Sequence, residues 1–166
     1  MSTPRELSAL PVHPHPTVDT RSYRLRIDGL VANSLALGVA DLLALPQQRL
    51  QDDFTCLEGW TVPDLDWAGV RLGDVLDLVH PTPAAQWVQA SFADFSLPLP
   101  LAEARAALLA LTLDGALLAP EHGAPVRLLV PGGECYTSVK WLDHLELRAE
   151  PAENSAQEIA LNRLRR

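Results

Sequence analysis

The chain has 166 residues, 48% of them hydrophobic and 20% charged, and its formal net charge at pH 7 is −8. This length and composition predict one globular domain with a substantial core, and we expect no second catalytic domain. Nucleic acids and anionic membranes are bound through a basic face, so the net charge argues against both as partners. An anionic ligand would therefore need a local cluster of donors.

No apolar run reaches the roughly 18 residues that a membrane-spanning helix needs, and residues 1–6 lack the pattern of a signal peptide. We therefore expect a cytoplasmic protein. Its two cysteines, Cys56 and Cys135, do not form a disulfide framework. In a reducing compartment such a pair is more often free thiol or metal ligand.

The first elements of the chain are an arm, a strand and a short helix. Four closely spaced prolines in residues 1–20 predict an extended or mobile arm, because proline prevents helix formation there. Apolar and basic residues alternate over 23–27, which is the period of a half-buried strand. Residues 39–45 predict a short helix that the following proline ends. A second strand over 48–55 then leads directly to Cys56.

Beyond Cys56, helical and strand patterns alternate. Residues 72–79 carry apolar side chains at helical spacing, and residues 87–91 and 95–99 predict strands. Residues 101–111 have good helix propensity and predict a helix. The continuous apolar run at 126–130 predicts a further strand.

The order of these elements has no regular strand–helix–strand rhythm, which favours an α+β fold over a doubly wound one. We place the domain at residues 21–150, after the arm at 1–20. The tail at 151–166 is polar and then weakly amphipathic, so both a short closing helix and a mobile segment are open for it.

Cys56 permits three interpretations: a small buried side chain, a nucleophile or a metal ligand. No local signature pairs it with His122 or His144 as a base. A single cysteine is too few for a structural zinc or iron–sulfur site, which takes about four protein ligands. It is enough when a cofactor supplies the remaining ligands, and thiolate is a soft ligand.

A Gly-rich loop followed by a cation lies near the C-terminal end of the domain. Gly132 and Gly133 can adopt backbone angles that point several N–H groups at an anion. Lys140 is the one lysine of the chain and can add a point charge, although a solvated surface lysine is the alternative.

Two arginines and one histidine are further candidates for binding. Arg71 and Arg127 can clamp a phosphate or an oxyanion in bidentate fashion, or they can pair with acidic residues at the surface. His122 precedes a glycine, where hydrogen bonding to a ligand and exposure in a loop are both open.

Six segments, spread over roughly residues 22–148, resemble the sulfite oxidase-type molybdopterin oxidoreductases in their order and spacing. They are residues 23–31, 41–46, 56–60 (CLEGW), 67–72 (WAGVRL), 122–132 (HGAPVRLLVPG) and 138–142 (SVKWL). The resemblance implies the molybdopterin-binding fold of that family, with mixed β-sheets and short helices in a single domain.

The resemblance also implies a chemistry and a set of site residues. Cys56 would be the catalytic cysteine that ligates molybdenum, alongside two sulfurs of the pterin; tungsten is also open as the metal. The residues implied to hold the molybdenum–molybdopterin cofactor are Gly132, Gly133, Lys140, Arg71, Arg127, His122 and Ser138. The reaction implied is two-electron oxygen-atom transfer on a small substrate, with a separate electron-transfer partner, and the substrate class implied is a sulfur oxyanion or sulfoxide.

The sequence departs from the family pattern at two places. Cys135 stands where relatives often have glycine. The first interpretation of this second thiol is that it only fills space in the packing. Residues 57–60 differ from the asparagine and arginine that follow the ligand in sulfite-oxidising members, which argues against sulfite. Two other functions remain open: a catalytically silent cofactor-binding or interaction module, and a cysteine-dependent hydrolase or redox protein.

Overall fold

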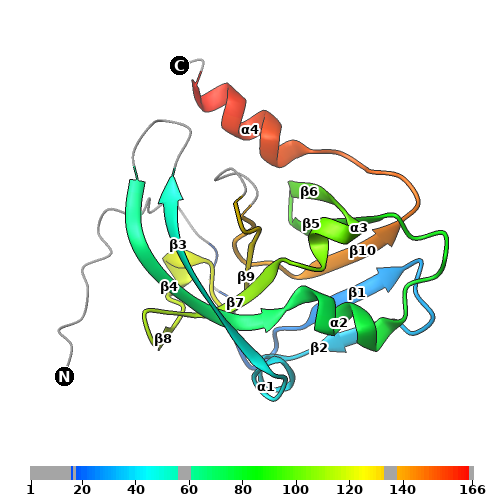
Figure 1. Cartoon of the computed structure of the whole chain (residues 1–166), viewed down its shortest axis with the longest axis horizontal. Coiled ribbons are helices and arrows are strands. Elements are labelled where there is room, and N and C mark those ends of the chain that lie inside the picture. Colours follow the sequence, from blue (N-terminus) through cyan, green and yellow to red (C-terminus); the bar gives the residue numbers. More distant parts are fainter. Residues whose placement is uncertain (1–15, 17, 56–60, 133–137, 165–166) are drawn as a thin grey trace.

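The computed structural model describes residue 16 and residues 18–55, 61–132 and 138–164 (Figure 1). Most of the predicted N-terminal arm lies outside the described residues. The same is true of Cys56, Gly133 and Cys135.

The described residues form strands and short helices in mixed order. The strands are β1 (Leu25–Gly29), β2 (Leu35–Leu37), β3 (Gln47–Thr55), β4 (Thr61–Arg71), β5 (Trp87–Phe92), β6 (Phe95–Pro100), β7 (Leu108–Leu113), β8 (Ala116–Leu117), β9 (Arg127–Leu129) and β10 (His144–Arg148). The helices are α1 (Val39–Leu43), α2 (Leu72–Val79), α3 (Leu101–Ala104) and α4 (Ser155–Leu164), and η1 (Pro120–His122) is a 3-10 turn. None of the described helices has the length and apolar character needed to cross a membrane.

The strands form two sheets. In the first, the order is β2-β1-β10-β5-β6, with β1 and β10 parallel and the other neighbours antiparallel. In the second, the order is β3-β4-β7-β8, with β9 also paired to β7 and all pairs antiparallel. Mixed sheets with short helices are the predicted α+β arrangement.

Helix α2 forms where the sequence predicts it because its apolar residues recur on one face. Leu72, Val75, Leu76 and Val79 are all fully buried, at the spacing of successive helical turns. The helix ends at Val79, and its C-cap His80 adopts the left-handed conformation immediately before a proline.

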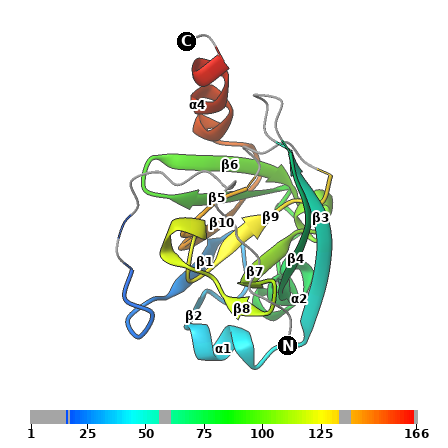
Figure 2. The same cartoon turned by 90° about the vertical axis from the view of Figure 1, so that its left-hand side faces the viewer.

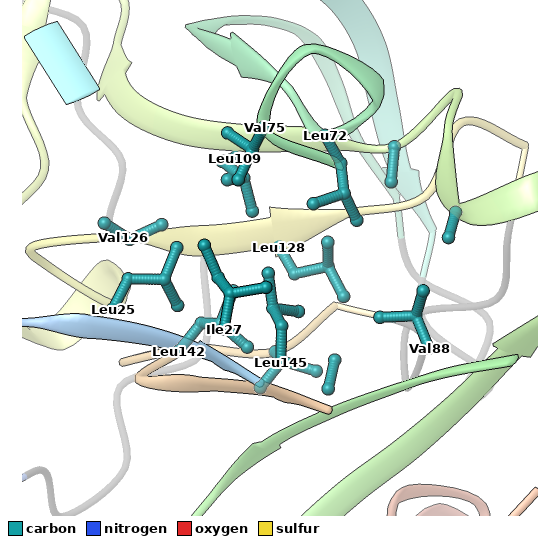
Figure 3. Packing of buried hydrophobic residues seen from close by; sticks show 14 of the residues in the cluster. Leu25, Ile27, Leu72, Val75, Val88, Leu109, Val126, Leu128, Leu142 and Leu145 are labelled. Atoms are coloured by element: carbon teal, nitrogen blue, oxygen red, sulfur yellow. The ribbon is translucent and has the colours of Figure 1, made fainter. Parts of the chain in front are cut away.

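The main core lies between the first sheet and the face of β7, β9 and α2 that is turned toward it. Figure 3 shows Leu128 of β9 between Leu72 of α2 and Leu145 of β10, and all three side chains are fully buried. A second, smaller cluster includes Trp67 of β4 and Leu129 of β9. Strands β4, β7 and β9 of the second sheet therefore have buried apolar side chains on both faces.

The predicted helix over residues 101–111 is wrong in its second half. Only Leu101–Ala104 is helical, and Leu108–Leu113 is strand β7, which lies between β4 and β9. A strand buried on both faces has a continuous apolar sequence, which periodicity alone cannot distinguish from a buried helix. Burial in the sheet overrides the helix propensity of these residues.

Strands β3 and β4 form a long hairpin, visible in cyan and green in Figure 1. Their last paired residues are Thr55 and Thr61, and residues 56–60 connect them. The prediction that a strand leads directly to Cys56 is confirmed, because β3 ends at Thr55.

The C-terminal tail, for which the sequence left two states open, contains helix α4. This helix lies beside β6 and extends away from the sheets (Figures 1 and 2). Its first residue, Ser155, donates from Oγ to the carbonyl of Asp94 at 2.6 Å and accepts from the backbone N–H of Ser96 at 2.8 Å. These two bonds fix the start of α4 to the β5–β6 turn.

Candidate functional site

Four of the predicted site residues come together around η1 and β9. His122 ends the 3-10 turn, and Arg127 is the first residue of β9. Ser138 and Lys140 lie on the segment that follows, which pairs with β9 through the Leu128–Val139 bridge. The sheet therefore holds side chains from two neighbouring segments of chain against the turn.

Arg127 is the buried cation of this group, with only 3% of its surface exposed. Its Nε donates to Ser138 Oγ at 2.6 Å, and its NH1 donates to the carbonyl of His122 at 3.2 Å. The guanidinium also lies over the ring of Trp67, with Cζ 4.9 Å from the ring centroid. Burial lowers the pKa of Arg127 to about 10, so the side chain is still a cation at neutral pH.

Lys140 is half-buried and not a solvated surface lysine. Its ammonium donates to the carbonyl of Glu121 at 3.0 Å and lies 5.7 Å from the ring centroid of Trp141. Two positive side chains thus converge on the η1 turn of a net-negative protein.

His122 is buried, with 8% of its surface exposed, so the interpretation of an exposed loop histidine is wrong. Its Nδ1 is buried and has no hydrogen-bond partner among the described residues. Burial lowers the pKa of His122, and although Glu121 opposes that effect, the charges of Arg127 and Lys140 lower the pKa further. The imidazole is therefore mostly neutral at pH 7, with a buried ring nitrogen that no described residue satisfies.

The lowered pKa of His122 predicts a pH dependence of stability. The unfolded chain takes up a proton near the ordinary value of 6.5, whereas the folded chain takes it up at lower pH. The free energy of unfolding should therefore be highest above that value and fall as the pH drops through the folded pKa. Urea unfolding from about pH 8 to about pH 5 should show a smaller loss of stability in His122→Gln than in the wild type. Parallel curves for the two proteins would contradict this assignment.

The other predicted residues lie outside this group. Gly132 follows β9 with a φ of 71°, and a side chain placed there would contact nothing within 4 Å. Arg71 is exposed at the start of α2, and among the described residues it has no hydrogen bond or ion pair with His122 or Arg127. Gly133 and Cys56 lie outside the described residues.

Two features of the site have no direct sequence signal. Trp67 forms the surface on which the Arg127 guanidinium lies. The carbonyls of Glu121 and His122 accept from the two cations, and a backbone acceptor carries no residue identity. The position of Trp67 two residues before Gly69 does not show that its ring contacts Arg127, and no sequence spacing shows which carbonyls accept from the cations.

A separate polar cluster occupies the solvent-facing side of β1 and β10. Potential ligand atoms of Asp28, His144 and Glu146 lie within 4.8 Å of one another. His144 Nε2 lies 2.8 Å from Asp28 Oδ1, and Arg148 NH1 donates to Glu146 Oε1 at 2.5 Å. These partners satisfy one another, so the cluster connects and stabilises the strands and gives no indication of a metal.

Comparison with known proteins gives matches over most of the chain. The family description "Oxidoreductase molybdopterin binding domain" matches residues 12–156. The oxidoreductase YuiH of Bacillus subtilis is 31% identical over 135 residues, which are 80% of this chain and 68% of YuiH. The protein-methionine-sulfoxide reductase catalytic subunit MsrP of Campylobacter jejuni is 26% identical, over 86% of this chain and 54% of MsrP.

A solved structure with the same fold is the sulfane dehydrogenase SoxCD from Paracoccus pantotrophus. The TM-score is 0.77 and the sequence identity 26%, over 82% of this chain and 40% of that chain. This chain thus spans 54% of MsrP and 40% of the SoxCD chain.

These matches confirm three predictions made from the sequence. The resemblance holds, and the sulfite oxidase-type fold with mixed sheets is confirmed by the SoxCD structure. Molybdenum–molybdopterin is the cofactor that the family binds. With residues 12–156 matched, the chain belongs to the oxidoreductase molybdopterin binding domain family.

Proposed function

We propose that this protein is a molybdenum–molybdopterin-dependent oxidoreductase that carries out two-electron oxygen-atom transfer on a small sulfur oxyanion or sulfoxide. The observation that carries the proposal is the buried cation Arg127, with Lys140 and the Nδ1 of His122, to which no described residue hydrogen-bonds, beside it. MsrP, a relative in sequence, and SoxCD, which shares the fold, are named for reactions at sulfur, and this supports the substrate class.

The residues fit a phosphate-bearing pterin. Removing a cation from water is costly, and a bound anion offsets that cost most strongly where the surroundings exclude water. Arg127 is such a cation, and Lys140 provides a second positive charge on the same turn. The buried Nδ1 of His122 is available for a hydrogen bond, and the space around Gly132 leaves its backbone accessible to a ligand.

Each side chain has a role in binding. Arg127, fixed by Ser138, would orient the phosphate through its planar fork, and Lys140 would add charge without directional constraint. His122 would hydrogen-bond the pterin as a neutral ring. Cys56 would provide a thiolate to the metal from the connection between β3 and β4. The bound group supplies the oxygen-atom transfer itself.

Two further parts of the proposal concern the surroundings of the protein. A separate electron-transfer partner accepts or provides the two electrons of each turnover, because oxygen-atom transfer changes the oxidation state of the metal. We place this reaction in the cytoplasm, where the thiol of Cys56 stays reduced.

The proposal is tested by metal and pterin analysis of protein purified from a host that makes the cofactor. We expect near-stoichiometric molybdenum and pterin, and turnover with sulfite, sulfoxides or related compounds when an artificial electron carrier is supplied. Nitrate is included in the screen as an oxyanion without sulfur. Turnover with nitrate alone would overturn the substrate class, and bound pterin without turnover would select the silent binding module. Metal-free activity that thiol alkylation abolishes would select the cysteine-dependent enzyme.

Lys140→Met tests the phosphate role of the ammonium. We expect cofactor loss on dialysis to be about tenfold faster, because a hydrogen bond to a charged group contributes roughly 1.5 kcal/mol. The rate should also depend less on salt concentration, since one screened charge has been removed. Arg105→Met is the matched control, because it removes a positive charge from the surface pair with Asp77. Equal retention in both variants would contradict the role of Lys140.

A further inference from the structure

The turn at residues 120–123 accepts hydrogen bonds at four successive carbonyls. Pro120 accepts from the indole Nε1 of Trp141 at 2.8 Å, and Glu121 accepts from the ammonium of Lys140 at 3.0 Å. His122 accepts from Arg127 at 3.2 Å. Gly123 accepts from the backbone N–H of Trp141 at 3.1 Å. One short piece of backbone therefore contacts both cations of the site.

Gly123 is the position of this turn where a side chain does not fit. A Cβ placed there would lie 3.0 Å from Cα, Cβ and Cγ of Lys140, which is closer than ordinary van der Waals contact. Its φ is 105°, a backbone conformation that residues other than glycine adopt only under strain. The contact is with the stem of Lys140 and not with its flexible tip, so the lysine cannot yield by rotating its far end.

The residue after Lys140 is fixed by the same turn. Trp141 has a φ of 56°, which is uncommon for a tryptophan, and its backbone and its indole each donate to the turn. The stem of Lys140 thus packs against Gly123, and the next residue, Trp141, is fixed to the same turn by two hydrogen bonds. From this position the ammonium donates to the carbonyl of Glu121 in η1.

We propose that Gly123 is a positioning residue for Lys140, and that the turn at 120–123 sets the two cations at a fixed separation for an anionic ligand. The proposal rests on the proposed function for the identity of that ligand. Backbone carbonyls of the turn set the distance between the two positive charges. A substitution in the turn would therefore weaken ligand binding by moving the ammonium of Lys140.

The test is a double-mutant cycle on the holoenzyme, with the rate of pterin loss on dialysis as the readout. We expect Gly123→Ala to speed loss by about threefold to tenfold, which lies in the lower part of the range for coupled contacts. In a Lys140→Met background the same change should add less than about twofold, because the group that Gly123 positions is gone. The salt dependence of the loss rate should become shallower in Gly123→Ala, as in Lys140→Met.

Gly115→Ala is the matched control. Gly115 also has a positive φ, 85°, but a Cβ there would contact nothing within 4 Å. It therefore reproduces the backbone strain without the contact, and pterin loss should be unchanged. If Gly123→Ala has the same effect in both backgrounds, the residue has a purely structural role and the inference is overturned.

A milder variant is available if Gly123→Ala does not fold. Trp141→Phe removes the indole donor to Pro120 and keeps an aromatic ring, and it should show the same non-additivity with Lys140→Met. Additive effects in that cycle would also overturn the inference. If Lys140→Met alone leaves pterin loss unchanged, the phosphate role in the proposed function fails instead, which separates the two outcomes.

Discussion

Replacing Cys56 with serine is expected to remove molybdenum from the purified protein almost completely. Serine is a harder ligand with a much higher pKa than cysteine, so the soft metal–thiolate bond has no substitute. Loss of residues that only support a ligand lowers metal affinity by about 10-fold to 100-fold, and loss of the ligand itself should exceed that. Molybdenum per protein by mass spectrometry, with pterin measured in the same sample, checks the result.

Cys135→Ala is the matched control for this prediction. Both residues are cysteines beside the proposed cofactor segments of the sequence, but the family resemblance assigns ligation to Cys56 alone. Cys135→Ala should keep the metal and the pterin. Full metal content in both variants would show that neither thiol is the ligand. Metal loss in Cys135→Ala alone would show that Cys135, and not Cys56, is the ligand.

Arg127→Met should have the second-largest effect, weakening cofactor binding by about 100-fold. Removing one partner of a buried charged pair costs roughly 2–5 kcal/mol, and each 1.4 kcal/mol is a factor of ten. The change also leaves the carbonyl of His122 and the hydroxyl of Ser138 without their donor. The pterin that remains bound after gel filtration, measured against protein concentration, gives the result.

Two controls separate charge from geometry at Arg127. Arg127→Lys keeps the positive charge but lacks the planar fork, so it cannot donate to Ser138 and His122 together. We expect its retention of pterin to lie closer to Arg127→Met than to the wild type. Arg49→Met removes an exposed arginine that pairs with Asp66 and should leave binding unchanged. Full retention in Arg127→Lys would mean that charge alone is required.

The sequence predicts the elements whose pattern is local. Helix α2 follows from its apolar spacing, and β3 ends at Thr55 as its predicted bounds require. Strand β7 is predicted wrongly as helix, because a strand buried on both faces has no alternation to reveal it. Strand β10 goes unpredicted although His144–Arg148 alternates between buried and half-buried residues. Its position between two strands distant in sequence depends on pairing that no local pattern encodes.

The candidate site is predictable where motifs carry it. His122, Arg127, Ser138 and Lys140 are identified by resemblance, and the structure brings these four together. Arg71 belongs to a matching segment but lies apart from them at the start of α2. The carbonyls of the turn are unpredictable, because hydrogen-bond acceptors of the backbone are the same for every residue. Only a folded chain shows which of them face the cations.

The place of β10 between β1 and β5 has a consequence for the order of assembly. The first sheet lacks its middle strand until synthesis reaches Arg148, so β1 and β5 have unpaired edges while most of the chain has already left the ribosome. Lys140 lies just before β10, so the residues that we propose to bind the cofactor reach their final positions when this strand inserts. A nascent chain halted before β10 would therefore present chaperones with an unfinished sheet and an unassembled candidate site.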